Sequence, residues 1–488
     1  MFSDMYILFC GYVSNKRNIE PNSVPLSLAF HPKISFLVRI IVPLVIVGTI
    51  ITFIVSSFST GASVDLEVSA SNNTAHGSTF SVPQMFTFSL GKTVKEMYQA
   101  RVYTLMALVL IFSGIWPYVK LLLMFIAWVS NERWLTLQRR ERLLIWLDAF
   151  GKYSLVDSFV LVLMLVSFRF HVDLELPFIS VIDSFVIPKD GFYTFLCATI
   201  LSLVIGHLVT YLHRYSMMPK LSRNDQCQKE SLQNHIFENK YPNQRLLKMS
   251  NKGKWVWLSF NIIAVILLLV GVTQKCFIFE FKGAAGLVLG NQREERYSVI
   301  SLGTSLPMSV KDPSDLGIIS IQWTYFFFAL FMPLASILMV NVLFYVPMTL
   351  KNQNRAFTFA EICNAWSAIE VFLLSVFASM LELSQFAKFM VGDHCDFLKG
   401  DFMKDLFNEE DTCFSVQSRL GSGSIYLCCG VLLQCFIMSI SLRLCHQTIE
   451  ERMEREGLLD RGINHKGGTD SFVFKLLSLC LFQSSMSD

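Results

Sequence analysis

Long apolar runs recur along this chain of 488 residues. A helix needs about 20 mainly apolar residues to cross the hydrocarbon core of a bilayer. We predict eight such spans: Ile34–Ser56, Tyr103–Trp128, Leu155–Phe170, Phe192–Leu212, Trp255–Thr273, Trp323–Val346, Phe359–Leu381 and Ile425–Leu444. The third is short unless the preceding segment, Leu143–Lys152, continues its helix. The chain is therefore expected to be an all-α polytopic membrane protein.

The composition agrees with this class and excludes others. Hydrophobic residues make up 53% and charged residues 16%, whereas soluble domains carry about a quarter charged residues. Basic residues are spread over the loops, so no nucleic-acid partner is expected. The twelve cysteines contain no C-x-x-C pair, so we predict no metal site or cofactor. No nucleotide-binding or catalytic motif is present, and we predict that the chain is not an enzyme.

Two stretches of the chain share a motif that contains an acid. Tyr153–Phe159 (YSLVDSF) and Trp366–Phe372 (WSAIEVF) both place a serine after an aromatic residue, a carboxylate three residues later and a phenylalanine two beyond. The span before each motif contains a proline, Pro117 or Pro333. We predict an internal repeat of two tandem four-helix modules related by an axis along the membrane normal.

The predicted boundaries place an N-terminal segment at 1–33, the modules at 34–213 and 255–446, a basic linker at 214–254 and a tail at 447–488. Basic residues concentrate in the linker, in the tail and in the loop after the second span. The positive-inside rule then places both termini in the cytoplasm.

The non-cytoplasmic loops are expected to contain small β-elements. Val64–Val68 and Tyr297–Ile300 show the alternation of a strand. Asn72 begins a glycosylation triplet on this side. Cys395 and Cys413 flank an acidic loop there, where either a disulfide or two free thiols would fit.

Polar residues inside the spans are the candidate functional residues, because a charge in the membrane is costly unless it is paired or solvated. We predict that Lys120 pairs with Asp157. Glu370, the counterpart of Asp157, has only Ser336 and Asn341 as nearby polar candidates. His207 is expected to be an interior histidine with its hydrogen bonds satisfied rather than a ligand.

Alternative roles for the acids remain open at this stage. Asp157 could lie at headgroup depth as a helix-start acid, with Ser154 and Ser367 acting as N-cap residues. The acids could instead contact a lipid headgroup or a cation, or carry protons.

Two segments, Gly114–Leu121 (GIWPYVKL) and Leu147–Asp157 (LDAFGKYSLVD), resemble the paraquat-inducible protein A family. The resemblance implies a tandem of two four-span modules and a role beside MCE-type proteins, which move lipids between membranes. It also implies that Lys120, Asp157 and Glu370 lie near the lipid path. Bacterial members carry cysteine-rich zinc ribbons that this chain lacks, so no metal site is implied.

The favoured function is therefore lipid transport or lipid handling, with membrane lipids and an MCE-type or other non-cytoplasmic protein as partners. Four-span modules with a cysteine-bearing loop also resemble tetraspanin-like organisers, so a non-transporting scaffold is one alternative. An ion-coupled small-molecule transporter is another.

Overall fold

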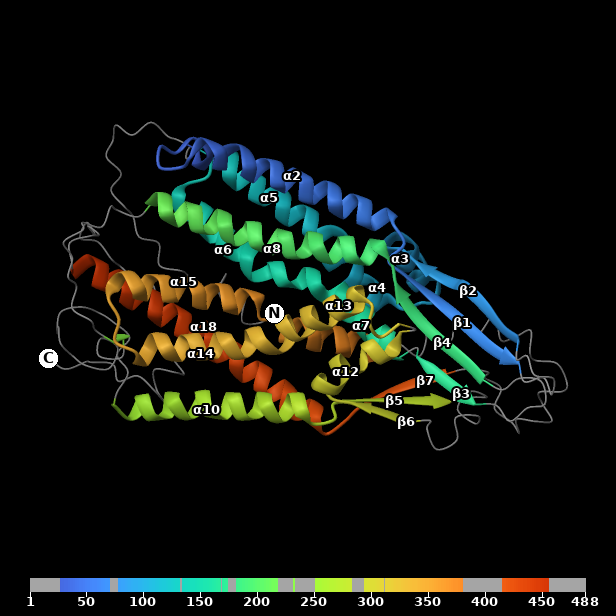
Figure 1. Ribbon diagram of the computed structural model, residues 1–488. Coiled ribbons are helices and arrows are strands. Elements are labelled where there is room, and N and C mark those ends of the chain that lie inside the picture. The colour runs from blue at the N-terminus through green and yellow to red at the C-terminus, as the bar shows by residue number, and fades with distance from the viewer. Residues whose placement is uncertain are drawn as a thin grey trace.

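The structure, a computed structural model, describes residues 27–70, 78–131, 134–167, 169–173, 181–217, 231–232, 251–282, 294–310, 312–380 and 415–455. Over these residues the chain forms an elongated bundle of helices, and two small sheets lie beyond the same end of the bundle (Figure 1). We call this end the sheet side and the other end the linker side. Eight helical segments of the described chain are long and apolar enough to cross a membrane.

The first half of the chain, up to residue 217, supplies four of these segments and four strands. In order its elements are η1 (Leu28–Phe30), α2 (Phe36–Phe58), β1 (Ala62–Ala70), β2 (Ser78–Phe88), α3 (Leu90–Gln99), α4 (Tyr103–Val109), η2 (Leu110–Ile115), α5 (Trp116–Val129), α6 (Leu137–Gly151), η3 (Lys152–Leu155), α7 (Val156–Ser167), β3 (Phe170–Asp173), β4 (Val181–Pro188) and α8 (Asp190–Met217).

The second half follows a similar order. Its elements are α10 (Asn251–Thr273), β5 (Phe277–Lys282), β6 (Glu294–Tyr297), α12 (Val299–Ser305), η5 (Pro307–Ser309), α13 (Leu316–Phe326), η6 (Phe327–Phe331), α14 (Met332–Tyr345), α15 (Leu350–Trp366), β7 (Ser415–Leu420) and α18 (Gly423–Arg455). A further helix covers residues 369–380.

The eight predicted spans are confirmed, but the third and seventh begin earlier than predicted, at Arg139 and Leu350. Both helices begin with polar residues, so hydropathy did not identify where they start. Asp157 therefore lies inside its span, about 15 Å from the Ser167 end at a rise of about 1.5 Å per residue. This position argues against the alternative that placed Asp157 at headgroup depth.

Both halves interrupt their second and third spans at similar places. In the second span a π-helix, η2 or η6, immediately precedes the helix whose second residue is Pro117 or Pro333. Proline lacks a backbone N–H, so it fits at such a discontinuity. The third span passes through the 3₁₀ turn η3 between α6 and α7. Its counterpart is broken at Ser367 and Ala368, between α15 and the helix over 369–380.

The sheets are antiparallel and are built from the loops on one side of the bundle. Their strand orders are β2-β1-β4-β3 and β6-β5-β7. In each, the strand after the first span of its half (β1 or β5) pairs with the strand that leads into the last span (β4 or β7). The strand predicted at Val64–Val68 is confirmed within β1. The strand predicted at Tyr297–Ile300 is wrong. β6 ends at Tyr297, and Ser298 forms the capping box at the start of α12.

The interrupted third and seventh spans lie at the centre of the bundle. In their most apolar stretches 78% and 67% of residues are buried, against 22% in α2. On α2 the exposed side chains are large and apolar, including Phe36, Leu37 and Leu44, as expected for a surface in contact with lipid. The site is therefore sought where the two interrupted spans meet.

Candidate functional site

The two acid motifs meet through their phenylalanines. Phe159 of α7 packs edge-on against Phe372, with ring centroids 5.5 Å apart and planes at 75°. Tyr325 of α13 packs on both rings, at 6.2 and 5.5 Å. All three side chains are buried. The contact joins two residues that occupy the same position in the two motifs, so it lies at the centre of the interface between the halves.

Each helix break is held against the π-helix of the neighbouring span. Tyr153 stacks on Phe112 at 5.3 Å, and Trp366 lies on Phe328 at 5.8 Å. The backbone N–H of Ala368 donates to the Phe328 carbonyl at 3.0 Å. In the first half the Trp116 indole N–H donates to the Phe150 carbonyl at 2.9 Å. Backbone groups freed by a break inside a membrane require such partners.

An ion pair links the two breaks across the halves. The Lys152 ammonium of η3 contacts the Glu370 carboxylate, and their side chains are only 4% and 15% exposed. The sequence analysis assigned Lys152 to a basic loop and missed this partner. Its position five residues before Asp157, next to an apolar run, was the available signal.

The predicted pair of Lys120 and Asp157 is wrong. Lys120 is buried, and its ammonium donates to the Ser202 carbonyl of α8 at 3.1 Å. The ammonium occupies the space left by Gly151, where an added Cβ would lie 2.6 Å from Nζ. Among the described residues no hydrogen bond or ion pair joins Lys120 to Asp157.

Asp157 instead lines an open pocket of about 770 Å3, counting the space at its mouth. The pocket lies between α2, α3, α7, α8 and the ends of β1, β2 and β4 nearest the helices. From α7 it is lined by Asp157, Val160, Leu161 and Met164, a spacing that puts all four on one helix face. Within the described chain no hydrogen bond or ion pair is formed by the Asp157 carboxylate.

Ser336 and Ser367 lie beside a buried glutamine at a helix break, whereas Asn341 contacts another residue. Gln434 of α18, which the sequence analysis missed, donates to the Pro333 carbonyl at 3.1 Å and approaches the hydroxyls of Ser336 and Ser367 at 3.3 and 3.4 Å. A glutamine inside an apolar run was the signal for it. Asn341 donates to Asn261 at 3.2 Å and has no role near Glu370.

Neither motif serine is the N-cap of the helix that follows it. Ser154 is buried within η3, and Ser367 follows the last residue of α15 as its C-cap. The prediction of N-cap roles is therefore wrong, because each helix begins one or two residues later than the motif suggests.

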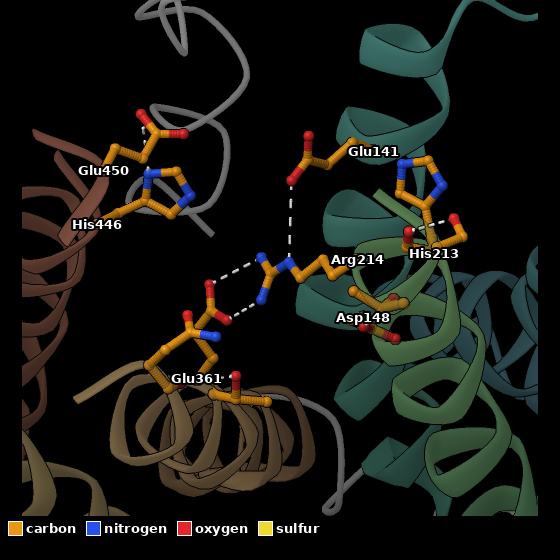
Figure 2. A network of polar contacts seen from close by, with 11 residues as sticks. Glu141, Asp148, His213, Arg214, Glu361, His446 and Glu450 are labelled. Atoms are coloured by element: carbon orange, nitrogen blue, oxygen red, sulfur yellow. Dashed lines mark hydrogen bonds and ion pairs between the residues drawn. The ribbon is translucent and has the colours of Figure 1, made fainter. Parts of the chain in front are cut away.

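A second polar cluster joins the halves toward the linker side (Figure 2). Arg214 of α8 forms an ion pair with Glu361 of α15 and lies 3.8 Å from Glu141 of α6. Nearby, Asp148 accepts from Thr210 at 2.7 Å and lies 3.4 Å from Nδ1 of His207. His207 thus lies beside a carboxylate, but the prediction that its hydrogen bonds are satisfied is wrong, because its buried Nε2 has no hydrogen-bond partner among the described residues.

The candidate glycosylation site Asn72 lies outside the described residues, as do Cys395 and Cys413, which could form a disulfide or remain free thiols. Among the residues that the structure describes, no group of three or more His, Cys, Asp and Glu side chains could hold a metal ion.

These features define an integral multi-pass helical membrane protein with interrupted central spans. The family model described as Paraquat-inducible protein A matches residues 303–396. This match supports the chain as a member of the paraquat-inducible protein A family. It covers η6, Pro333 and the second acid motif, whereas the motifs that first suggested the family lie in the other half. No curated protein and no solved structure matches the chain significantly.

Proposed function

We propose that this protein takes up membrane lipid and passes it to the sheet side. The observation that carries the proposal is the Asp157 pocket. It is lined mainly by apolar groups and opens among the elements of the sheet side. Such a lining suits an acyl chain, because a polar ligand would lose its hydration there with few hydrogen-bond partners to replace it. In this proposal the protein moves its ligand and catalyses no reaction.

The two halves are, in this proposal, copies of one four-helix module. The shared order of interruptions, the similar sheet pairings and the contact of Phe159 with Phe372 support a common origin. The first half presents its acid, Asp157, to this pocket, whereas Glu370 of the second half is in an ion pair with Lys152. The copies would then have diverged, with one acid in a ligand site and the other in an ion pair.

The sheets would provide the docking surface for a protein partner of MCE type or of similar role. They lie together beyond one end of the bundle (Figure 1), and β2 and β6 end their sheet orders as edge strands. An exposed edge strand can pair with a strand of another chain. With both termini in the cytoplasm, as predicted from the basic loops, this surface would face away from it.

Native mass spectrometry of gently purified protein tests the proposal. We expect stoichiometric bound lipid in the wild type and its loss in Leu161→Trp, which fills the pocket. The control is Leu44→Trp on α2, where the side chain is 66% exposed on the outer face. If the bound lipid has the composition of the bulk membrane and Leu161→Trp does not change it, the result would favour the non-transporting scaffold.

An ion-coupled transporter is a second candidate, favoured by the buried pair of Lys152 and Glu370. Ionisable groups in a membrane interior are typical of coupled transport. This candidate predicts that Glu370→Gln abolishes the pH dependence of transport in vesicles while lipid remains bound in the pocket. If the transport rate of the wild type does not depend on pH, the ion-coupled transporter is excluded as a candidate.

A further inference from the structure

The two acid motifs differ in whether their carboxylate has a partner. In the alignment that matches Asp157 with Glu370, Lys152 falls opposite Ala365. Glu370 is paired across the halves by Lys152, whereas the second motif carries no lysine at the matching position that could pair with Asp157 in return. Asp157 has no ion-pair partner among the described residues.

The surroundings of Asp157 make an unneutralised charge costly. It lies within a membrane span, and it is the one charged residue among those that line the pocket. A carboxylate in such a place must bind a proton or receive a cation from elsewhere. Because no cationic side chain among the described residues pairs with Asp157 or lines the pocket, an occupant of the pocket can provide the cation.

The side chains that line the pocket indicate that the ligand also has an apolar part. Val160, Leu161 and Met164 continue the face of α7 that starts at Asp157, and they extend over about 10 Å at the helical rise. On the opposite wall Phe192 and Phe195 of α8 add aromatic surface. A ligand that matches both features has a cationic group at one end and an apolar body.

We propose that this pocket binds an amphiphile that carries an amine, with the ammonium on the Asp157 carboxylate and the apolar part along α7. The ammonium can belong to a free long-chain base or to an aminophospholipid headgroup, and both present the same chemistry to Asp157. This inference rests on the proposed lipid-handling function and gives it a ligand class. Anionic lipids are excluded by repulsion from Asp157.

The test measures binding to the purified full chain by native mass spectrometry. One pair of ligands is dodecylamine and dodecanol; the other is phosphatidylethanolamine and phosphatidylglycerol with the same acyl chains. We expect the amine of at least one pair to bind at least about tenfold more tightly, as a charge-assisted hydrogen bond allows. A preference in the first pair alone identifies a long-chain base, and one in the second identifies a phospholipid.

Asp157→Asn, which keeps the shape of the side chain, should abolish the preference. Asp312→Asn in an exposed turn is the matched control and should leave it intact. If Asp157→Asn does not fold, Leu161→Trp keeps the charge but fills the pocket, and it should lose both amines. Equal binding of amine and neutral or anionic ligand by the wild type would overturn the inference while leaving lipid handling in place. Preference that survives both pocket substitutions would overturn it as well.

Discussion

Lys152 and Glu370 form a buried ion pair between the halves of the protein, at the point where each half interrupts a central span. Lys152 lies in η3 and Glu370 in the first turn of the helix over 369–380. The pair thus ties together the two least regular parts of the membrane core. Its energetic importance can be measured.

Breaking this pair should destabilise the protein strongly. Glu370→Gln leaves the Lys152 ammonium buried without its carboxylate, which costs about 3 kcal/mol or more. Reversible unfolding in mixed micelles measures the loss. The control is Glu294→Gln on β6, where Glu294 and its partner Arg296 are 40% and 56% exposed; it should cost less than about 0.5 kcal/mol. Equal effects of the two substitutions would contradict the role of the pair.

The two carboxylates near Arg214 in the linker-side cluster should contribute unequally to the stability of the protein (Figure 2). Glu361 contacts Arg214 through two guanidinium nitrogens, whereas Glu141 lies 3.8 Å from Nε. Bidentate contacts are the stronger kind. Glu361→Gln should therefore destabilise by about 1–2 kcal/mol, and Glu141→Gln by no more than about half of that. A larger loss from Glu141→Gln in the same unfolding assay would contradict the observed geometry.

Helix packing in the second half should depend on a glycine. A Cβ added at Gly271 of α10 would lie 2.6 Å from the Leu427 Cα of α18, a contact with backbone that cannot rotate away. Gly271→Ala should separate these helices and cost about 1–3 kcal/mol. Gly48→Ala on α2 is the control, since no other atom lies within 4 Å there. Thermal unfolding should show a lower midpoint for Gly271→Ala alone.

The thiol of Cys276, between α10 and β5, should resist alkylation. Burial, and then the neighbouring Cys428 thiol, raise its pKa from 9.0 to about 12. It also donates to the Gly271 carbonyl at 3.0 Å. Because the thiolate is the reactive form, N-ethylmaleimide at pH 8 should spare Cys276 until the protein unfolds. Peptide mapping that finds Cys276 labelled first would contradict its buried placement.

The raised pKa of Cys276 also determines how the stability of the fold changes with pH. The unfolded thiol loses its proton near pH 9 while the folded one keeps it, so this group stabilises the fold below pH 9. That contribution is lost as the pH rises toward about 12. Cys276→Ala should weaken the alkaline decline in stability, measured by unfolding between pH 8 and pH 10. An identical decline in wild type and variant would show that other groups cause it.

Hydropathy predicted the spans and local motifs predicted the two corresponding acids, because each of these features depends only on residues that are close together in the sequence. Asp157, Glu370, Pro117 and Pro333 stand out in this way. The partner of each charge could not be predicted, since it depends on how distant helices pack. Gly151 leaves room for Lys120 beside α8, and this single packing detail redirects the lysine from its predicted partner.

The continuity of the third span was also hidden, for a local reason. Arg139, Arg140, Glu141 and Arg142 begin a helix that has the composition of a loop. Arg140 is buried and donates to the Ser130 carbonyl at 2.6 Å. A charge satisfied in this way does not end a helix, but hydropathy cannot recognise such a partner. The headgroup depth considered for Asp157 depended on this short third span.

The central claim, that lipid enters the Asp157 pocket, is tested most directly by photo-crosslinking. A benzophenone amino acid replaces Leu161 in the pocket, Leu44 on the outer face of α2, or the buried Val162 beside the pocket. Each protein is extracted, washed free of bulk lipid in detergent and then irradiated. We predict a lipid adduct at position 161 and none at the other two. Adducts at none of the positions, or equally at 44 and 161, would contradict the claim.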